Sequence, residues 1–395
     1  MSDSTRVIVA RALRGWADGL VSVLLAGYLT RLGFGPVEVG AIVTGTLVGS
    51  AAVTTAVGLA GGDVARRTVL LAAAVLMAGT GVGFAALRAF WPLFAVAVVG
   101  TLNPSGGDVS VFLPVEQAVL AETTRGSART GRFATYNVAG AFAAGIGALL
   151  SGFPELVARR AGVDPVVAER LAFLAYAVIG CTVGGLYLGL SPAIEHRPRE
   201  RRAPLARSRR VVLELSALFS LDSFGGGFVV QSLLVLWLYR RFGLSVETAG
   251  AVFFAVGLLG AASQLVSARL AARIGLVRTM VYTHLPANVF LALAGVVPSA
   301  PAAVGFLLLR AALSSMDVPA RQAYVMALVP PEERMAAASV TNVPRSLATA
   351  LAPVLTGLML ARSSFGWPLV CAGVLKATYD VVLLVRFVGV EIPAD

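Results

Sequence analysis

The stretch PVEQAVLAETTRGSARTGRFATYNVAGAFAAGIGALLSG, residues 114–152, recurs in altered form as PARQAYVMALVPPEERMAAASVTNVPRSLATALAPVLTG, residues 319–357. The two stretches align at a constant offset without a gap, so that Asn137 meets Asn342. A looser match between RGWADGL and FSLDSFG aligns Asp18 with Asp222. Repetition at a fixed period indicates repeated structural units, so we expect the two halves of the chain to share one fold.

Most of the chain is apolar. Hydrophobic residues make up 57% of the sequence and charged residues only 13%, whereas about a quarter of the residues in a soluble domain are charged. A helix that crosses the hydrocarbon layer needs roughly 20 apolar residues. We expect spans over residues 9–30, 37–60, 69–87, 91–121, 128–152, 170–190, 211–239, 246–270, 278–298, 302–328, 335–361 and 366–388. The sequence therefore predicts an all-α membrane protein with twelve transmembrane helices in two pseudo-symmetric six-helix bundles.

The basic residues are distributed unevenly between the connecting segments. With a cytoplasmic N-terminus, twenty of the 32 lysines and arginines lie on the cytoplasmic side and eight on the outer side. Enrichment of Lys and Arg in cytoplasmic loops is typical of membrane proteins. The asymmetry predicts that both termini are cytoplasmic, and it accounts for the net charge of +11 without a nucleic-acid partner.

The segment SPAIEHRPRERRAPLARSRR, residues 191–210, is basic and contains proline. It predicts a cytoplasmic linker between an N-terminal bundle, residues 1–190, and a C-terminal bundle, residues 211–395. The linker either fixes the topology or also binds anionic lipid headgroups. Only one of the 32 basic residues is a lysine, a usage that suggests a high-GC bacterium and hence the inner membrane. No feature indicates an oligomer, so we expect a monomer.

The sequence lacks motifs for nucleotide binding and for catalysis. No G-x-x-x-x-G-K-[ST] nucleotide loop occurs, and no span carries a catalytic Ser/His pair or a His-x-x-x-His pattern. Cys181 and Cys371 have neither disulfide nor metal spacing. We therefore expect no enzymatic activity, no cofactor and no resident metal.

Duplicated six-helix units are typical of secondary transporters, whose binding site lies near the bilayer midplane. With its repeat and its spans, the chain resembles the major facilitator superfamily over essentially its whole length. The loop GLAGGDVARRTVL is similar to the family's cytoplasmic gate motif and implies gating roles for Asp63, Arg66 and Arg67. Its glycine spacing differs by one residue, and Val64 stands where the family has a basic residue.

The second copy of this loop, ARLAARIGLVRTM, keeps Arg273 and has Ala272 at the acidic position. The resemblance therefore implies a gating role for Arg273 as well. Glu116 lies near the cytoplasmic end of its span, and we expect it to pair with Arg132 as a gate latch. The span 128–152 lacks the Gly-Pro pair of the proton-antiporter signature.

Ionisable residues inside the spans point to the site. Each costs about 2.5–3.5 kcal/mol at the centre of a membrane helix, so they must pair with one another or face water. They are Asp18, Asp108, Asp222, Arg310, Asp317, Arg321, Arg345, Lys376 and Asp380. The i,i+4 spacing predicts an Asp317–Arg321 pair and a Lys376–Asp380 pair, and we expect the second pair to neutralise itself.

In the resembled family, the first, fourth, seventh and tenth helices line the central cavity. Asp18, Asp108, Asp222 and Asp317 fall one on each of them, which implies a cavity lined by carboxylates. Two arginines and three asparagines complete the candidate set for binding substrate or protons: Arg321, Arg345, Asn103, Asn137 and Asn342. His284 stands alone and reads as a packed polar residue rather than as a proton relay.

Glycines and prolines flank two of these acids. Gly225–Gly227 follow Asp222 and either let the helix bend or allow close helix packing. Pro104 and Pro114 bracket Asp108 and predict an irregular helix, which is tolerated at membrane depth where protein or a water-filled cavity satisfies the backbone.

The sequence thus predicts a secondary transporter that lies in the lipid bilayer and works by alternating access. It moves a small molecule or ion across the membrane in exchange for protons. The excess of carboxylates favours proton-coupled export of a cationic or lipophilic compound. A metal cation or an organic anion is the alternative substrate. A membrane sensor or scaffold that transports nothing is the alternative from another class.

Overall fold

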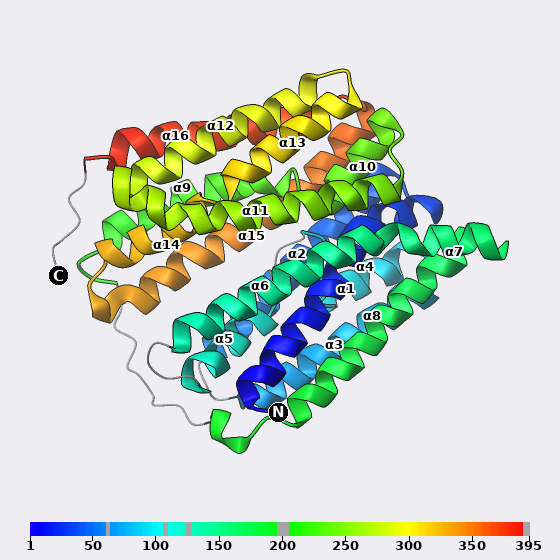
Figure 1. Cartoon of the computed structure of the whole chain (residues 1–395), viewed down its shortest axis with the longest axis horizontal. Coiled ribbons are helices and arrows are strands. Elements are labelled where there is room, and N and C mark those ends of the chain that lie inside the picture. The colour runs from blue at the N-terminus through cyan, green and yellow to red at the C-terminus, as the bar shows by residue number, and fades with distance from the viewer. Residues whose placement is uncertain (61–63, 106–109, 124–127, 196–204, 390–395) are drawn as a thin grey trace. The chain divides into compact units, whose positions relative to one another are not determined.

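The computed structural model describes residues 1–60, 64–105, 110–123, 128–195 and 205–389 (Figure 1). These residues form helices and connecting turns, and they contain no strand. The α-helices are α1 (Asp3–Arg31), α2 (Pro36–Ala60), α3 (Arg66–Ala86), α4 (Phe90–Val99), α5 (Phe112–Thr123), α6 (Ala128–Leu149), α7 (Phe153–Ala161), α8 (Pro165–Leu188), α9 (Arg209–Gly227), α10 (Gln231–Phe242), α11 (Val246–Ile274), α12 (Leu276–Val296), α13 (Ala300–Ser314), α14 (Asp317–Leu328), α15 (Arg334–Arg362) and α16 (Trp367–Phe387). Three 3-10 helices are η1 (Leu150–Gly152), η2 (Pro192–Glu195) and η3 (Pro331–Glu333).

Each expected span coincides with one helix or with a broken pair of helices, and the predicted fold class is confirmed. The broken pairs are α4/α5, α9/α10 and α13/α14. The break between α4 and α5 matches the irregular region expected around Pro104. The break between α13 and α14 was not expected from the hydropathy. It precedes Pro319, which has no backbone N–H to continue the helical hydrogen bonds.

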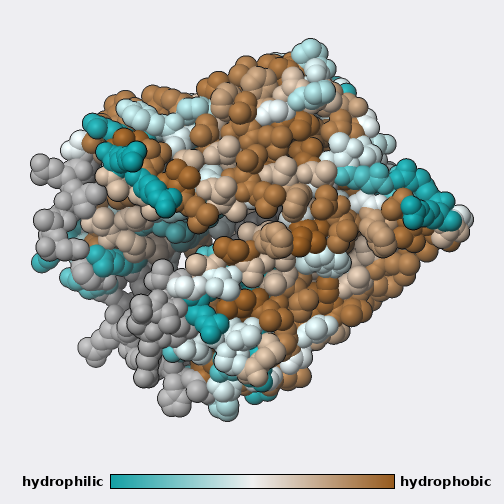
Figure 2. All heavy atoms as spheres, in the orientation of Figure 1, coloured by the Kyte–Doolittle hydropathy of each residue, from teal (hydrophilic) through white to brown (hydrophobic). Residues whose placement is uncertain are grey.

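Ten segments of the described chain are long and apolar enough to cross a membrane, and α4 is a shorter apolar helix. Large hydrophobic side chains cover much of the visible surface (Figure 2). Trp91, Leu265 and Val385 are each more than 70% exposed. A soluble protein rarely exposes apolar surface on this scale, so this surface fits the hydrocarbon of a bilayer.

The chain divides into two compact units. The first comprises Met1–Pro198 and Val230–Phe254, and the second comprises Arg199–Val229 and Ala255–Asp395. By their contacts, α10 and the start of α11 belong to the first unit. The predicted division into two bundles joined at residues 191–210 stays a prediction.

In the first unit, α1 packs along α6 and against α8, and α3 packs along α8. A Cβ atom on Gly19 would lie 2.0 Å from the carbonyl oxygen of Ala144, so a larger residue does not fit at this crossing. Small residues at helix crossings are the usual means of close packing in membranes. α10 packs against α1, where the Ser232 hydroxyl donates to the carbonyl oxygen of Ser22 at 2.8 Å.

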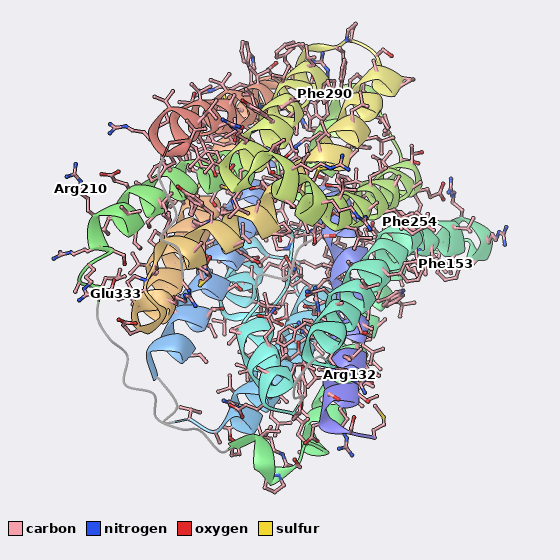
Figure 3. All side chains as sticks on the ribbon, turned by 60° about the vertical axis from the view of Figure 1, so that its left-hand side comes forward. Arg132, Phe153, Arg210, Phe254, Phe290 and Glu333 are labelled. Atoms are coloured by element: carbon pink, nitrogen blue, oxygen red, sulfur yellow. The ribbon has the colours of Figure 1, made fainter. Side chains whose placement is uncertain are left out.

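In the second unit, α9 contacts both α15 and α16, and α12 contacts α13, α14 and α16. The ring of Phe290 on α12 stacks on Phe306 of α13, with 6.0 Å between the centroids (Figure 3). The four neighbours of α9 and α12 thus bring several charged side chains of different helices into one buried region.

Candidate functional site

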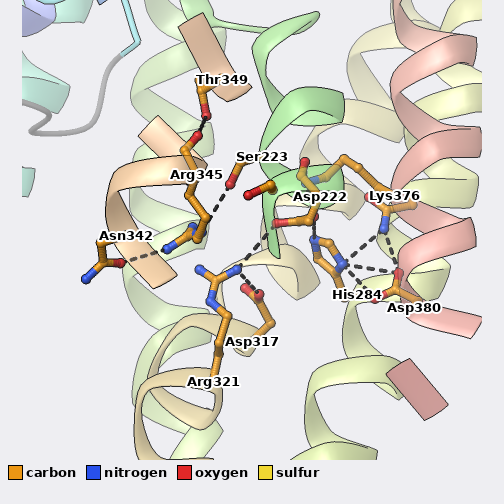
Figure 4. Close-up of polar contacts among 12 residues, drawn as sticks. Asp222, Ser223, His284, Asp317, Arg321, Asn342, Arg345, Thr349, Lys376 and Asp380 are labelled. Atoms are coloured by element: carbon orange, nitrogen blue, oxygen red, sulfur yellow. Dashed lines mark hydrogen bonds and ion pairs between the residues drawn. The ribbon is translucent and has the colours of Figure 1, made fainter. Parts of the chain in front are cut away.

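Asp222 lies at the centre of a buried group of charged residues in the second unit (Figure 4). Its Oδ1 accepts a hydrogen bond from Lys376 Nζ of α16 at 2.5 Å. Its Oδ2 lies 3.3 Å from Arg321 Nη1 of α14. A carboxylate inside a membrane protein must be paired or face water, and two cations from two other helices pair Asp222. We call this group, together with His284, Asp317, Arg345 and Asp380, the Asp222 cluster.

His284 of α12 lies between two carboxylates. Its Nδ1 is 2.9 Å from Asp380 Oδ1, and its Nε2 is 3.7 Å from Asp222 Oδ1. Asn288, one helical turn further along α12, donates from Nδ2 to Asp380 Oδ2 at 2.8 Å. Because imidazole can carry a proton on either nitrogen or on both, the three side chains form a row of titratable groups from α16 to α9, with a hydrogen bond at Asp380 and a longer contact of 3.7 Å at Asp222.

The predicted pair on α14 is confirmed. Asp317 Oδ2 lies 3.3 Å from Arg321 Nη1, and the same nitrogen contacts Asp222. Arg321 therefore joins the two candidate carboxylates of this unit, and all three side chains are buried.

The predicted pairing of Lys376 with Asp380 is wrong. Lys376 forms its ion pair with Asp222, whereas Asp380 binds His284 and Asn288. The i,i+4 spacing permits the local pair, but α16 packs against both α9 and α12, so each side chain finds its partner on a different neighbouring helix.

Arg345 of α15 lies at the edge of the cluster and is half-buried. Its Nε donates to Ser223 Oγ at 3.1 Å, and its Nη1 donates to Asn342 Oδ1 at 3.3 Å. Asn342 is exposed. Within the part of the chain that the structure describes, Arg345 has hydrogen bonds to these neutral groups and no ion pair.

The glycines after Asp222 end the helix that carries it. α9 stops at Gly227, and α10 begins at Gln231 after three residues. A Cβ atom on Gly227 would lie 2.2 Å from the carbonyl oxygen of Thr349, and one on Gly225 would lie 2.8 Å from Lys376 Cγ. Both alternatives drawn from the sequence therefore apply, since the glycines interrupt the helix and also allow α15 and α16 to approach it.

Four candidate residues belong to the first half of the chain, and the structure describes three of them. Asp18 of α1 is buried, and the Tyr176 hydroxyl lies 3.5 Å from its Oδ1. Asn103 is buried and accepts hydrogen bonds from Ser105 through Oδ1. Asn137 is exposed on α6. Asp108 lies outside the described residues.

Glu116 does not pair with Arg132 as predicted. Its carboxylate forms a buried ion pair with Arg14 of α1, and it accepts hydrogen bonds from the hydroxyls of Tyr136 at 2.7 Å and Tyr187 at 2.5 Å. Arg132 is exposed (Figure 3). Glu116 therefore ties α1, α5, α6 and α8 together, which is a contact within one unit.

The predicted gate residues occupy different environments. Arg66 is buried, forms an ion pair with Glu122 and donates to the Ile194 carbonyl oxygen at 2.9 Å. The backbone N–H groups of Arg66 and Arg67 donate to Glu195 at 2.7 and 2.9 Å, which caps the start of α3. Arg273 is exposed. Asp63 lies outside the described residues.

The end of the linker is held by Glu333. Its carboxylate accepts hydrogen bonds from the Ser208 hydroxyl at 2.5 Å and from the backbone N–H groups of Ala206, Arg207 and Ser208 at 2.9–3.1 Å. These bonds lower the pKa of Glu333 from 4.5 to about 2, chiefly through the Ser208 hydroxyl. Sequence reasoning had no signal for this contact, because glutamates in connecting loops are common.

Sequence reasoning left His284, Lys376 and Asp380 out of the candidate set and did not consider Asn288. The available signal was the i,i+4 spacing of His284 with Asn288 and of Lys376 with Asp380, which puts each pair on one helix face. What the spacing could not reveal is that Lys376 and His284 reach Asp222 of α9, while Asp380 and Asn288 meet between α12 and α16.

Several known proteins are similar to the chain. It is 25% identical to the "Uncharacterized membrane protein YJR124C" of Saccharomyces cerevisiae, over 96% of the chain and 92% of that protein. A D-xylose-proton symporter superimposes with a TM-score of 0.75 at 15% identity, over 96% of each chain. A bacterial homologue of the human lysosomal transporter Spinster gives 0.75 at 15% identity, over 98% of this chain and 97% of that one.

These structural likenesses show the fold, and the family follows from the sequence itself. The model of the Major Facilitator Superfamily matches residues 7–300 and 217–394. The chain is thus a multi-pass membrane protein that belongs to the major facilitator superfamily of transporters.

Proposed function

We propose that the chain is a proton-coupled secondary transporter of a small organic solute, and that the Asp222 cluster carries the proton. The observation that supports this is the chain of side chains Asp380–His284–Asp222, which is buried and reaches from α16 through α12 to α9. Ionisable residues inside a membrane protein commonly form proton relays.

The ion pairs give protonation a mechanical consequence. Lys376 and Arg321 both bind the carboxylate of Asp222. A proton on Asp222 removes the charge that holds both cations, so the contacts of α9 with α14 and α16 weaken together. A local change of charge that biases a two-state packing arrangement is the usual form of such a switch. The break between α9 and α10 is a suitable hinge, because α9 ends at Gly227, only five residues after Asp222.

Substrate and direction are further parts of the proposal. The sequence favours export of a cationic or lipophilic compound, with a metal cation or an organic anion as the alternative. Among the described residues, no group of three or more His, Cys, Asp or Glu side chains could hold a metal ion. We propose an organic solute, and we propose that it moves outward.

Location and assembly are proposed from the sequence alone. The uneven distribution of arginines between the loops supports cytoplasmic termini. The scarcity of lysine, which suggests a high-GC bacterium, supports a bacterial inner membrane. We propose a monomer that is surrounded by lipid, with the linker near the anionic headgroups.

Proteoliposomes with a trapped pH-sensitive dye test the proposal. Radiolabelled tetraphenylphosphonium, benzoate, uridine and xylose are offered with and without a pH gradient. We expect one of these classes to move faster with the gradient, and a protonophore to abolish the acceleration. Flux that ignores the gradient contradicts proton coupling, and the absence of any flux favours a sensor or scaffold.

Two substitutions test whether Asp222 and His284 carry the proton. Asp222→Asn and His284→Gln are expected to lose the gradient-driven flux and to retain solute exchange across vesicles of equal pH. Glu214→Gln is the matched control, because Glu214 is an exposed carboxylate on the same helix as Asp222.

A further inference from the structure

The charges of the second unit do not balance. Three buried carboxylates, Asp222, Asp317 and Asp380, belong to the spans that form the Asp222 cluster. Four permanent cations lie well inside the described spans of this unit, namely Arg310, Arg321, Arg345 and Lys376, whereas the other arginines of these helices lie near helix ends. Two of these, Lys376 and Arg321, take up Asp222 and Asp317. Asp380 binds His284 and Asn288. Each of the three carboxylates therefore has a partner, and the four permanent cations outnumber them by one.

Arg345 carries part of this remaining charge in an accessible place. Its two hydrogen-bond partners, Ser223 and Asn342, are uncharged. A guanidinium has five N–H donors, so most of the donors of Arg345 are not used by these two bonds. Asn342 beside it is exposed.

Arg321 reinforces the field at Arg345. The two guanidinium groups face each other in the close-up view (Figure 4), and they repel each other electrostatically. Only one of these two neighbouring arginines is neutralised. An anion bound beside them relieves their repulsion, because it supplies the missing negative charge.

Arg310 of α13 adds a second cation. It belongs to the same broken span as Asp317 and Arg321 of α14. Asp222 and Asp317 act on Arg310 electrostatically, but within the described residues it has no hydrogen bond or ion pair of its own, and its Nε is buried without a partner.

We propose that the transported solute is an organic anion, and that its carboxylate or phosphate group binds Arg345, with Asn342 as a neighbouring donor and Arg310 as additional positive charge. This inference rests on the proposed transport function and names its substrate class. Arg is the side chain best suited to such groups, because its planar fork donates two parallel hydrogen bonds to one anion. It replaces the cationic substrate favoured by the sequence, since the carboxylates that favoured a cation are occupied.

Binding is measured without a proton gradient, so that its result is independent of proton coupling. The purified full-length chain in phosphatidylcholine nanodiscs is titrated with benzoate, citrate, uridine monophosphate and tetraphenylphosphonium, and thermal unfolding is followed. A ligand that binds only the folded state raises the Tm. We expect at least one of the three anions to raise the Tm, and tetraphenylphosphonium to have no effect.

Three variants test the assigned residue. Arg345→Gln is expected to weaken the apparent Kd for the stabilising anion by about 10- to 100-fold, the range for a lost hydrogen bond to a charged group. Arg345→Lys keeps the charge and is expected to bind with intermediate affinity. Arg362→Gln, at an exposed position near the end of the same helix, is expected to bind like the unaltered chain.

Several results overturn the inference. Stabilisation by tetraphenylphosphonium, or by none of the anions, does so directly. Stabilisation by an anion that Arg345→Gln leaves intact moves the site elsewhere. If only nanodiscs with added phosphatidylglycerol are stabilised in an Arg345-dependent manner, the arginine binds a lipid headgroup and not a solute. Anion binding without gradient-driven flux would instead reject the proton coupling and retain the substrate class.

Discussion

Lys376 and Asp222 are 154 residues apart in the chain, and the Lys376 Nζ lies 2.5 Å from the Asp222 Oδ1 in a buried ion pair. The pair joins the first helix of the second unit, α9, to its last helix, α16. Removal of one partner of a buried pair is costly because the other charge stays in a medium of low dielectric constant. The pair therefore gives the clearest stability test of this site.

We predict that Asp222→Asn lowers the free energy of unfolding by about 3–5 kcal/mol, since Lys376 then lacks its carboxylate. The double variant Asp222→Asn with Lys376→Met should recover part of this loss. Thermal unfolding of the purified variants in detergent gives the comparison. Strictly additive effects of the two single substitutions would falsify the pairing.

Gly227 and Gly226 are neighbours with different surroundings. A Cβ atom on Gly227 would lie 2.2 Å from the Thr349 carbonyl oxygen, whereas one on Gly226 would have its nearest neighbour, Lys376 Nζ, at 3.9 Å. Gly227→Ala is therefore expected to destabilise the chain by about 1–3 kcal/mol through overpacking. Gly226→Ala is the matched control and should change the Tm little. Equal effects at the two positions would mean that helix bending, and not the α9–α15 contact, requires glycine here.

Glu116 distinguishes the observed contact from the one expected from the sequence. The ion pair with Arg14 is buried, with side-chain exposures of 1% for Arg14 and 0% for Glu116. Glu116→Gln removes a buried negative charge and should cost about 3 kcal/mol or more. Arg132→Gln alters an exposed residue and should have an effect near zero. A larger loss for Arg132→Gln than for Glu116→Gln, measured by thermal unfolding, contradicts the structural assignment.

Glu333 makes the docking of the linker dependent on pH. The hydrogen bonds from Ser208 and the backbone lower its pKa from 4.5 in the unfolded chain to about 2 in the folded chain. A lowered folded-state pKa contributes stability above the unfolded pKa, and this contribution is lost as the pH falls toward the folded value. The Tm difference between the unaltered chain and Glu333→Gln should thus be present above about pH 5 and shrink toward pH 2.

Limited proteolysis checks the same contact in another way. At neutral pH, trypsin is expected to cleave Glu333→Gln faster after Arg207 than it cleaves the unaltered chain. Glu332→Gln changes an exposed neighbour and serves as the control. Unchanged cleavage in Glu333→Gln would show that the linker is held by other contacts.

The sequence by itself determined the fold class, the approximate bounds of the spans, and the pair Asp317–Arg321. These follow from local rules, because hydrophobic length decides whether a helix can cross a bilayer and i,i+4 spacing decides which side chains meet on one helix. The glycines after Asp222 left two alternatives, a bend in the helix or close helix packing, and both apply.

Only the tertiary structure decided which charges meet across helices. Lys376 turns to Asp222 and not to Asp380, Glu116 turns to Arg14 and not to Arg132, and His284 lies between two carboxylates. A helix presents its charges on a face, but the partner depends on how neighbouring helices are rotated and how deeply they are placed. That arrangement is set by packing over the whole unit, so no local pattern of residues contains it.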